Sequence, residues 1–262
     1  MDFTSIGGLA LGILAIVVGR ILEGGNPLML MQFTAFLIVF GGTAGAMALS
    51  ATKEDIRNIP TLVGIAFRDA VTFPVDVIPQ IVKYAEKARR EGLLSLEREI
   101  PNVSDPFLQQ GLQLVADGTD PEVVRRILET EIDKQLDRHN KGPVMLESAG
   151  GYAPTVGIIG AVLGLISVME HLSEGIDKVG PGIAVAFVAT IYGLVLANML
   201  CFPIASKLRA RSAAEVLIKE MVLEGILSIQ AGDNPRIIEE KLKSFLSRSE
   251  RTVFEAQKEA RR

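Results

Sequence analysis

The sequence predicts an all-α, polytopic membrane protein with four transmembrane helices and a helical cytoplasmic lobe. Four long stretches contain no Asp, Glu, Lys or Arg, and nearly all of the charge lies in two other stretches. A membrane-spanning helix needs about 20 mostly apolar residues, within a range of roughly 17–25. The charged stretches place apolar residues at helical spacing and show no alternating strand pattern. The chain is 48% hydrophobic, a fraction that a soluble domain can also have. The prediction of a membrane protein therefore rests on the clustering of apolar residues into long uncharged stretches and not on their total.

Residues 1–52 hold the first two predicted spans, Phe3–Gly19 and Met31–Thr52, with a Gly-Gly-Asn-Pro turn between them. The first stretch has no basic region before it and no cleavage site after it, so we interpret it as a retained span. Gly8 and Gly12 form a G-x-x-x-G pattern, which can mark a face for close helix contact. Glycine is also common in membrane helices in general, so both interpretations stay open.

Residues 53–147 form a polar insert that we expect to be a compact helical lobe. Apolar residues recur there at helical spacing, as in Ile78, Ile81, Val82 and Ala85. Six prolines are expected to divide the insert into short helices: Pro60, Pro74, Pro79, Pro101, Pro106 and Pro121. At the last of them, Asp-Pro-Glu is typical of a helix start.

Residues 148–206 hold the third and fourth predicted spans, Ser148–Met169 and Val179–Ser206, separated by a short charged segment. Both are rich in Gly and Ala, which let the backbones of membrane helices approach closely. Pro154 lies in the first of them and Pro203 in the second. These two spans are therefore predicted to pack against other helices and not merely to anchor the chain.

Residues 207–262 form a polar tail of helices. A helical pattern covers Ser212–Ile229, Ala231–Arg236 interrupts it, and one amphipathic helix is expected from about Pro235 to the end. Basic residues flank the spans on the side of the insert and the tail. The positive-inside rule then places both segments and both chain termini in the cytoplasm.

Several functional classes find no support in the sequence. No nucleophile elbow, phosphate-binding loop or metal-ligand spacing occurs, so we expect neither an enzyme nor a bound metal or cofactor. The two histidines, His139 and His171, are interpreted as interfacial residues. Cys201 is expected to be a small packing residue. No basic face suggests a nucleic-acid partner.

The absence of charge within the spans has a consequence for ion transport. An ionisable residue inside a membrane costs about 2.5–3.5 kcal/mol on insertion scales and is kept there for function. If this protein moves ions, the titrating carboxylate must come from another chain; the alternative is a membrane scaffold. Neutral polar residues do occur in the spans, namely Thr155, Ser167, Thr190, Tyr192 and Asn198. Such hydroxyls often bond their own backbone, and Thr190 lies among small residues where a partner helix could come close.

The segment Glu86–Glu99 is dense in charges of both signs. It is either a solvated helix face with pairs such as Glu86 with Arg89 and Arg90, or an electrostatic docking surface. Composition favours the solvated face.

Four stretches resemble a known family: ARREGLLSLE (Ala88–Glu97), GGYAPTVGIIGAVLGLI (Gly150–Ile166), VAFVATIYGLVLAN (Val185–Asn198) and GILSIQAGDNPRIIEEKL (Gly225–Leu242). The chain resembles the MotA family of flagellar stator subunits, within the wider MotA/TolQ/ExbB group. The likeness extends over essentially the whole chain and includes the layout of four spans.

The resemblance implies a multi-pass protein of the bacterial inner membrane, assembled as a homopentamer around two copies of MotB. The partner would supply one membrane helix, the ion-carrying aspartate and a domain that binds peptidoglycan. Ion passage would turn the ring, which would then drive FliG of the rotor C-ring. The aspartate of the partner would supply the carboxylate that the predicted spans of this chain lack.

The resemblance also implies roles for individual residues. Arg89 and Glu97 match the family's charged residues for rotor contact, and their neighbours Arg90 and Glu99 are expected to share that contact.

The resemblance implies that the third and fourth spans, residues 148–206, form the channel. Within them Pro154 and Pro203 match two functional prolines, whose missing N–H permits a bend. Thr190 resembles a pore-facing threonine, and Thr155 is expected on the same ion path or partner-facing surface. Ala161 stands where sodium-driven relatives tend to carry threonine, which favours protons.

Two other functions remain as alternatives. An energiser of the ExbB or TolQ type usually has three spans and the opposite N-terminal placement, against which the first two spans argue. A small-solute transporter would be expected to show an internal repeat or a broken-helix site, and neither is convincing here.

Overall fold

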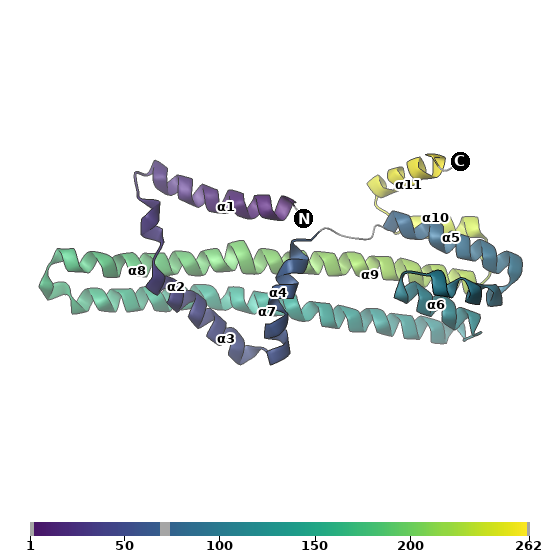
Figure 1. The fold of residues 1–262 in the computed structure, drawn as a ribbon, viewed down its shortest axis with the longest axis horizontal. Coiled ribbons are helices and arrows are strands. Elements are labelled where there is room, and N and C mark those ends of the chain that lie inside the picture. The colour runs from purple at the N-terminus through teal and green to yellow at the C-terminus, as the bar shows by residue number, and fades with distance from the viewer. Residues whose placement is uncertain (1–2, 69–73, 261–262) are drawn as a thin grey trace. The chain divides into compact units, whose positions relative to one another are not determined.

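The computed structural model describes residues 3–68 and 74–260, and the described residues form helices and short connections with no strand (Figure 1). The prediction of an all-α protein is confirmed. By their internal contacts the residues divide into two units. We call Met1–Asp69 with His139–Ala210 the apolar unit, and Ala70–Arg138 with Arg211–Arg262 the polar unit.

Among the described residues, four helical segments are long and apolar enough to cross a membrane. They are Thr4–Leu22, Pro27–Ser50, Pro121–Glu170 and Val179–Gln230. Large apolar side chains point outward on them; Leu11 is 68% exposed and Phe187 is 69% exposed. Lipid is the natural surrounding for such side chains, and the four predicted spans are confirmed.

The second span is less regular than predicted. After α1 (Phe3–Leu22), the chain forms the 3₁₀ turn η1 (Pro27–Leu30), the short helix α2 (Phe33–Phe36), the π-helix η2 (Leu37–Gly41) and α3 (Gly42–Ser50). Met31 and Gln32, between η1 and α2, are not helical. A break of this kind frees backbone groups inside the membrane, where they need other partners.

The helix α4 (Lys53–Ala66) follows and belongs to the apolar unit, although it lies within the stretch predicted to be the polar insert. Thr52 and Asp55 form a capping box at its start. The hydrogen bonds from Thr52 lower the pKa of the Asp55 carboxyl.

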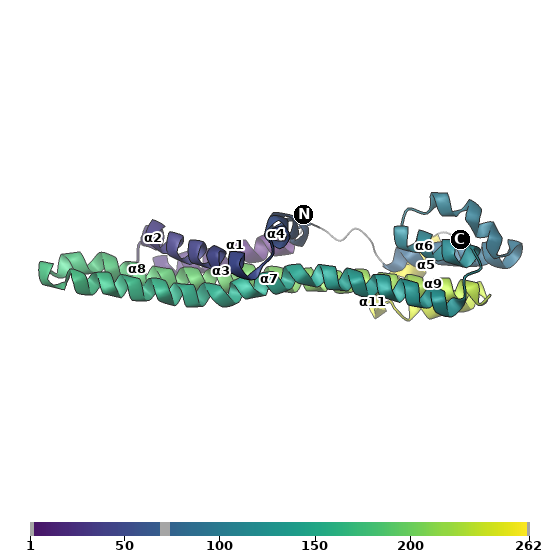
Figure 2. The same ribbon diagram turned by 90° about the horizontal axis from the view of Figure 1, so that it is seen from below.

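The third and fourth spans belong to long helices. The third lies in α7 (Pro121–Glu170), and the 3₁₀ turn η5 (Leu172–Glu174) leads into α8 (Ile176–Val195). The π-helix η6 (Leu196–Cys201) and α9 (Phe202–Gln230) continue α8 without interruption. The membrane part of α7 and α8 run antiparallel and side by side in both views (Figures 1 and 2).

Glycines set the distance between α7 and α8. A Cβ atom on Gly193 would lie 2.5 Å from the carbonyl oxygen of Ala153, and one on Gly157 would lie 2.9 Å from that of Ala189. The two backbones therefore touch, as small residues allow in membranes. By contrast, a Cβ on Gly8 would meet nothing within 4 Å, so within the G-x-x-x-G pattern only Gly12 makes a close contact, with Met199.

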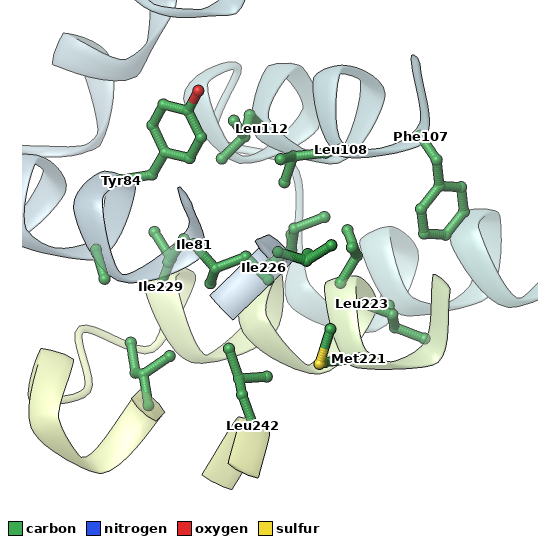
Figure 3. Close-up of a cluster of buried hydrophobic side chains, with 14 of the residues drawn as sticks. Ile81, Tyr84, Phe107, Leu108, Leu112, Met221, Leu223, Ile226, Ile229 and Leu242 are labelled. Carbon is green, nitrogen blue, oxygen red and sulfur yellow. The ribbon is translucent and has the colours of Figure 1, made fainter. Parts of the chain in front are cut away.

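The polar unit is built from short helices packed on the ends of two long ones. Its own elements are α5 (Pro74–Glu91), η3 (Leu93–Arg98), η4 (Ile100–Asn102), α6 (Pro106–Ala116), α10 (Pro235–Lys243) and α11 (Arg248–Ala260). Apolar side chains from α5, α6, α9 and α10 meet in one cluster (Figure 3). Ile81, Leu112, Ile226 and Leu242 are completely buried in it. Burying each such side chain contributes about 1.5–3 kcal/mol.

Two predictions about the polar helices are wrong. Pro60 and Pro79 lie inside α4 and α5 and do not end them. Each proline removes one backbone hydrogen bond, but tertiary packing supplies most of the stability of a helix, and Ile78 and Ile81 are fully buried beside Pro79. The single C-terminal helix is in fact two helices, because Ser247 caps α11 through the backbone N–H of Glu250.

Charged groups attach α11 to α10. Lys243 contacts Glu239 at 3.0 Å and Glu255 at 2.6 Å, and its ammonium lies 5.3 Å from the centre of the Phe254 ring. Burial alone would lower the pKa of Lys243, but the hydrogen bonds to these carboxylates outweigh it and raise that pKa. The lysine therefore stays charged at any physiological pH.

Candidate functional site

The charged segment at the end of α5 forms an exposed corner of the polar unit. Arg89 and Arg90 lie in the last turn of α5, where positive charge is favourable at a helix C-terminus. Gly92 has a φ of 83°, a conformation that suits glycine, and it turns the chain into η3. Glu97 lies in η3 and is exposed, as are both arginines.

The helical ion pairs expected in this segment do not form. Within the described part of the chain, Glu86, Arg89, Arg90 and Glu97 take part in no ion pair. Their charges are therefore left to solvent or to a partner. The solvated face that composition favoured therefore lacks its internal pairs.

Glu99, the fourth residue predicted for this surface, is directed inward. Its carboxylate accepts a hydrogen bond of 2.6 Å from Lys87 Nζ and lies 3.9 Å from Lys83 Nζ. The hydrogen bond from Lys87 lowers the pKa of the Glu99 carboxyl. Burial, together with the nearby Glu99 charge, raises the pKa of Tyr84. Glu99 thus fastens the chain after η3 to α5.

The two prolines of the third and fourth spans occupy different settings. Pro154 lies inside α7, and a Cβ on Gly193 would be 3.1 Å from its Cα, so Pro154 belongs to the face that meets α8. Pro203 lies in the first turn of α9 and is exposed. Because Pro203 has no N–H, it cannot donate to the carbonyl four residues earlier, and the π-helix η6 ends two residues before it. Irregular turns of this kind often occur at functional positions.

The three remaining predicted residues line different parts of the third and fourth spans. Thr190 is half-buried on α8, and its hydroxyl donates to the carbonyl of Ala186 at 3.2 Å. A Cβ on Gly157 would lie 3.4 Å from the Cα of Thr190, so the backbone of α8 contacts α7 at this threonine. Thr155 is exposed and donates to its own helix at Tyr152, at 2.7 Å. Ala161 is half-buried on α7.

Tyr192 has a structural role that the sequence did not reveal. Its hydroxyl donates to the carbonyl of Leu30 at 2.5 Å and accepts from the backbone N–H of Gln32 at 3.2 Å. These groups belong to the break in the second span. The ring also meets Phe40 edge-on, with centroids 6.4 Å apart. Tyr192 therefore ties the second span to the fourth and satisfies backbone groups that a regular helix would have paired internally.

Metal chemistry finds no support in the described residues, which contain no group of three potential His, Cys, Asp or Glu ligands. His171 lies at the end of α7 with Nδ1 2.8 Å from the carbonyl oxygen of Ser167. Its interpretation as an interfacial residue stays a prediction. Cys201 is buried, as expected of a packing residue.

Comparison with known proteins gives consistent matches along the chain. The model of the MotA/TolQ/ExbB proton channel family matches residues 99–221. Motility protein A of Bacillus subtilis (strain 168) is 38% identical over 261 residues, covering 99% of this chain and 96% of the relative. Chemotaxis protein PomA of Vibrio alginolyticus is 34% identical, covering 97% of this chain and 98% of the relative.

Two solved structures match almost the whole chain. The flagellar MotAB stator complex from Bacillus subtilis superimposes with a TM-score of 0.90 at 38% identity, covering 97% of this chain and 99% of that one. The structure of C. jejuni MotAB gives a TM-score of 0.89 at 32% identity, covering 95% and 97%.

We expect Tyr192→Phe to destabilise the apolar unit by about 1–3 kcal/mol, because it leaves two backbone groups without their partner. Thermal unfolding of the purified protein in detergent measures this as a lower Tm. Tyr152→Phe is the matched control, since Tyr152 is also half-buried. An equal loss of stability in both variants would contradict the role assigned to Tyr192.

Proposed function

Because the chain belongs to the MotA/TolQ/ExbB family and matches motility proteins over its whole length, it is a flagellar stator subunit of the inner membrane, and we propose that it works with a MotB-type partner to turn proton flow into torque. The match to the Bacillus subtilis MotAB stator, with a TM-score of 0.90 over 97% of this chain, carries this conclusion. An energiser of the ExbB or TolQ type and a solute transporter lack comparable support, since the matches reported above are to motility and chemotaxis proteins and to MotAB structures.

The ion path needs a titrating group that this chain does not provide in its spans. Ser148–Met169 and Val179–Ser206 contain no Asp, Glu, Lys or Arg. In our proposal a carboxylate on the single membrane helix of the partner carries the proton, and five copies of this chain surround two copies of the partner. Each charge that crosses the membrane releases about 2.3 kcal/mol per 100 mV. That energy is comparable with a modest rearrangement of packed helices.

The residues of the third and fourth spans would respond to protonation of the partner. Thr190 would face the partner helix, with Thr155 and Ala161 along the ion path. Pro154 and Pro203 would supply the points of bending, since neither donates a backbone hydrogen bond. The contact of Gly193 with Pro154 supports this, because movement at the proline must then be transmitted to α8.

The exposed corner of the polar unit would deliver the movement to FliG in the rotor. Arg89, Arg90 and Glu97 present charge that has no partner within the described chain. Glu99 would act indirectly, by holding η3 against α5 through Lys87. For this contact the polar unit and both termini must be cytoplasmic, as the basic residues that flank the spans favour.

Deleting the gene tests the stator function directly. We expect cells that assemble flagella but do not swim, and we expect this chain to restore swimming only in cells in which a single-span partner is also present. Electron microscopy scores the flagella, and light microscopy scores the swimming. Loss of the flagella themselves, or rescue by this chain without the partner, would contradict the proposal.

The coupling ion is tested in the rescued cells. We expect swimming to continue when sodium alone is removed at constant membrane potential, since Ala161 stands in place of a hydroxyl side chain. Collapsing the proton gradient with an ionophore is the positive control and should stop the cells. Arrest on sodium removal would refute proton coupling.

Charge reversal tests the contact with the rotor. We expect Arg89→Glu to reduce torque most strongly at high load, because placing like charges together across an interface costs several kcal/mol. Expression and membrane insertion should stay normal. Arg126→Glu is the control, an exposed arginine on α7 in the same unit. Equal torque in the Arg89→Glu variant and the unmodified protein would exclude Arg89 from the contact.

A further inference from the structure

An ion pair joins α7 and α9 where the uncharged stretches of the third and fourth spans end. Arg209 of α9 donates two hydrogen bonds to the carboxylate of Glu147 on α7, and the bond from Nη2 to Oε2 is 2.7 Å long. Both residues belong to the apolar unit. Because the pair is bidentate, it fixes the relative direction of the two side chains as well as their distance.

The ion pair lies close to both prolines of these spans. Glu147 precedes Pro154 by seven residues, and Arg209 follows Pro203 by six. At a rise of 1.5 Å per residue, these separations correspond to about 9–11 Å along each helix. A movement that starts at either proline therefore reaches the ion pair within two turns of helix.

The helices are also packed together beside the ion pair. Each charged residue follows a buried leucine, Leu146 on α7 and Leu208 on α9, and both leucines belong to one apolar cluster. A Cβ on Gly150 would lie 2.7 Å from Cε1 of Phe202, so α7 and α9 approach closely there. The two charged side chains themselves remain 36% and 45% exposed. An ion pair with this exposure adds little to stability, whereas its bidentate geometry still restricts how the helices can slide.

We propose that Glu147 and Arg209 are positioning residues, which hold α7 and α9 at a fixed axial position relative to each other next to Pro154 and Pro203. A bend at either proline then moves both helices together instead of letting one slide along the other. The inference rests on the proposed stator function. It adds to that function two residues that belong neither to the ion path nor to the rotor contact.

Charge reversal in the full chain, expressed with its partner subunit, tests the pair. The readout is the torque of one stator unit, taken from the speed steps of a bead-loaded motor as units join it one by one. Glu147→Arg and Arg209→Glu should each lower this torque about fivefold, because like charges then repel across the helix contact. The double variant, in which the two charges are exchanged, restores the attraction and should recover most of the torque.

A neutral variant and a matched control separate positioning from folding. Arg209→Gln removes the pair without adding repulsion, so it should lower the torque about twofold. The Tm of the purified complex should fall by about 4 °C at most, as expected for the loss of one exposed ion pair. Arg125→Glu is the control, because Arg125 forms a comparably exposed pair with Glu129 inside α7 alone, at 3.7 Å. Its torque should be unchanged.

Three results would overturn the inference. Normal torque in Arg209→Gln and in the reversal variants would mean that the helices keep their position without the pair. Low torque in the exchanged variant at an unchanged Tm would mean that the two charges act separately. A much larger fall of Tm in Arg209→Gln would make the pair a folding contact. Failure of the stator function itself is a different result, since the unmodified chain would then produce no speed steps and both proposals would be wrong.

Discussion

The contact between the backbones of α7 and α8 is the constraint on which the apolar unit depends. Lipid is as apolar as the side chains, so membrane helices associate through close van der Waals contact and not through burial from water. Gly157 and Gly193 lie opposite carbonyl groups of the facing helix, at distances that exclude a side chain. This contact fixes Pro154 and Thr190 on the same interface.

The polar unit is stabilised by burial of apolar side chains from water, unlike the apolar unit. Its helices are short, and its stability comes from one buried apolar cluster that joins α5 and α6 to the ends of α7 and α9 (Figure 3). On that base the turn at Gly92 holds Arg89, Arg90 and Glu97 at the surface without internal partners. In the proposed function, these three exposed charges would contact the rotor protein. The inward pair of Glu99 with Lys87 belongs to the packed base and not to that exposed charge.

Much of the fold could be predicted because charge and apolar periodicity decide it directly. The four spans and the start of α7 at Pro121 were accessible in this way. The break at Gln32 was not, because the group that satisfies it is Tyr192, distant in sequence. The persistence of helix through Pro79 depends equally on tertiary packing. For the candidate site, family resemblance supplied the residue names, but only the structure separates the inward Glu99 from its exposed neighbours.

The π-helix η6 changes the angular relation of residues on either side of it. The N–H of Phe202 donates to Ala197, five residues back, so the turn contains one residue more than a regular helix would. An α-helix rotates by about 100° for each residue. A helical wheel drawn through the fourth span therefore misplaces Pro203 relative to Thr190 by roughly that angle. Helix faces inferred from residue spacing are therefore valid only for residues on the same side of η6. The wide turn allows the fourth span to direct Thr190 and Pro203 toward different neighbours.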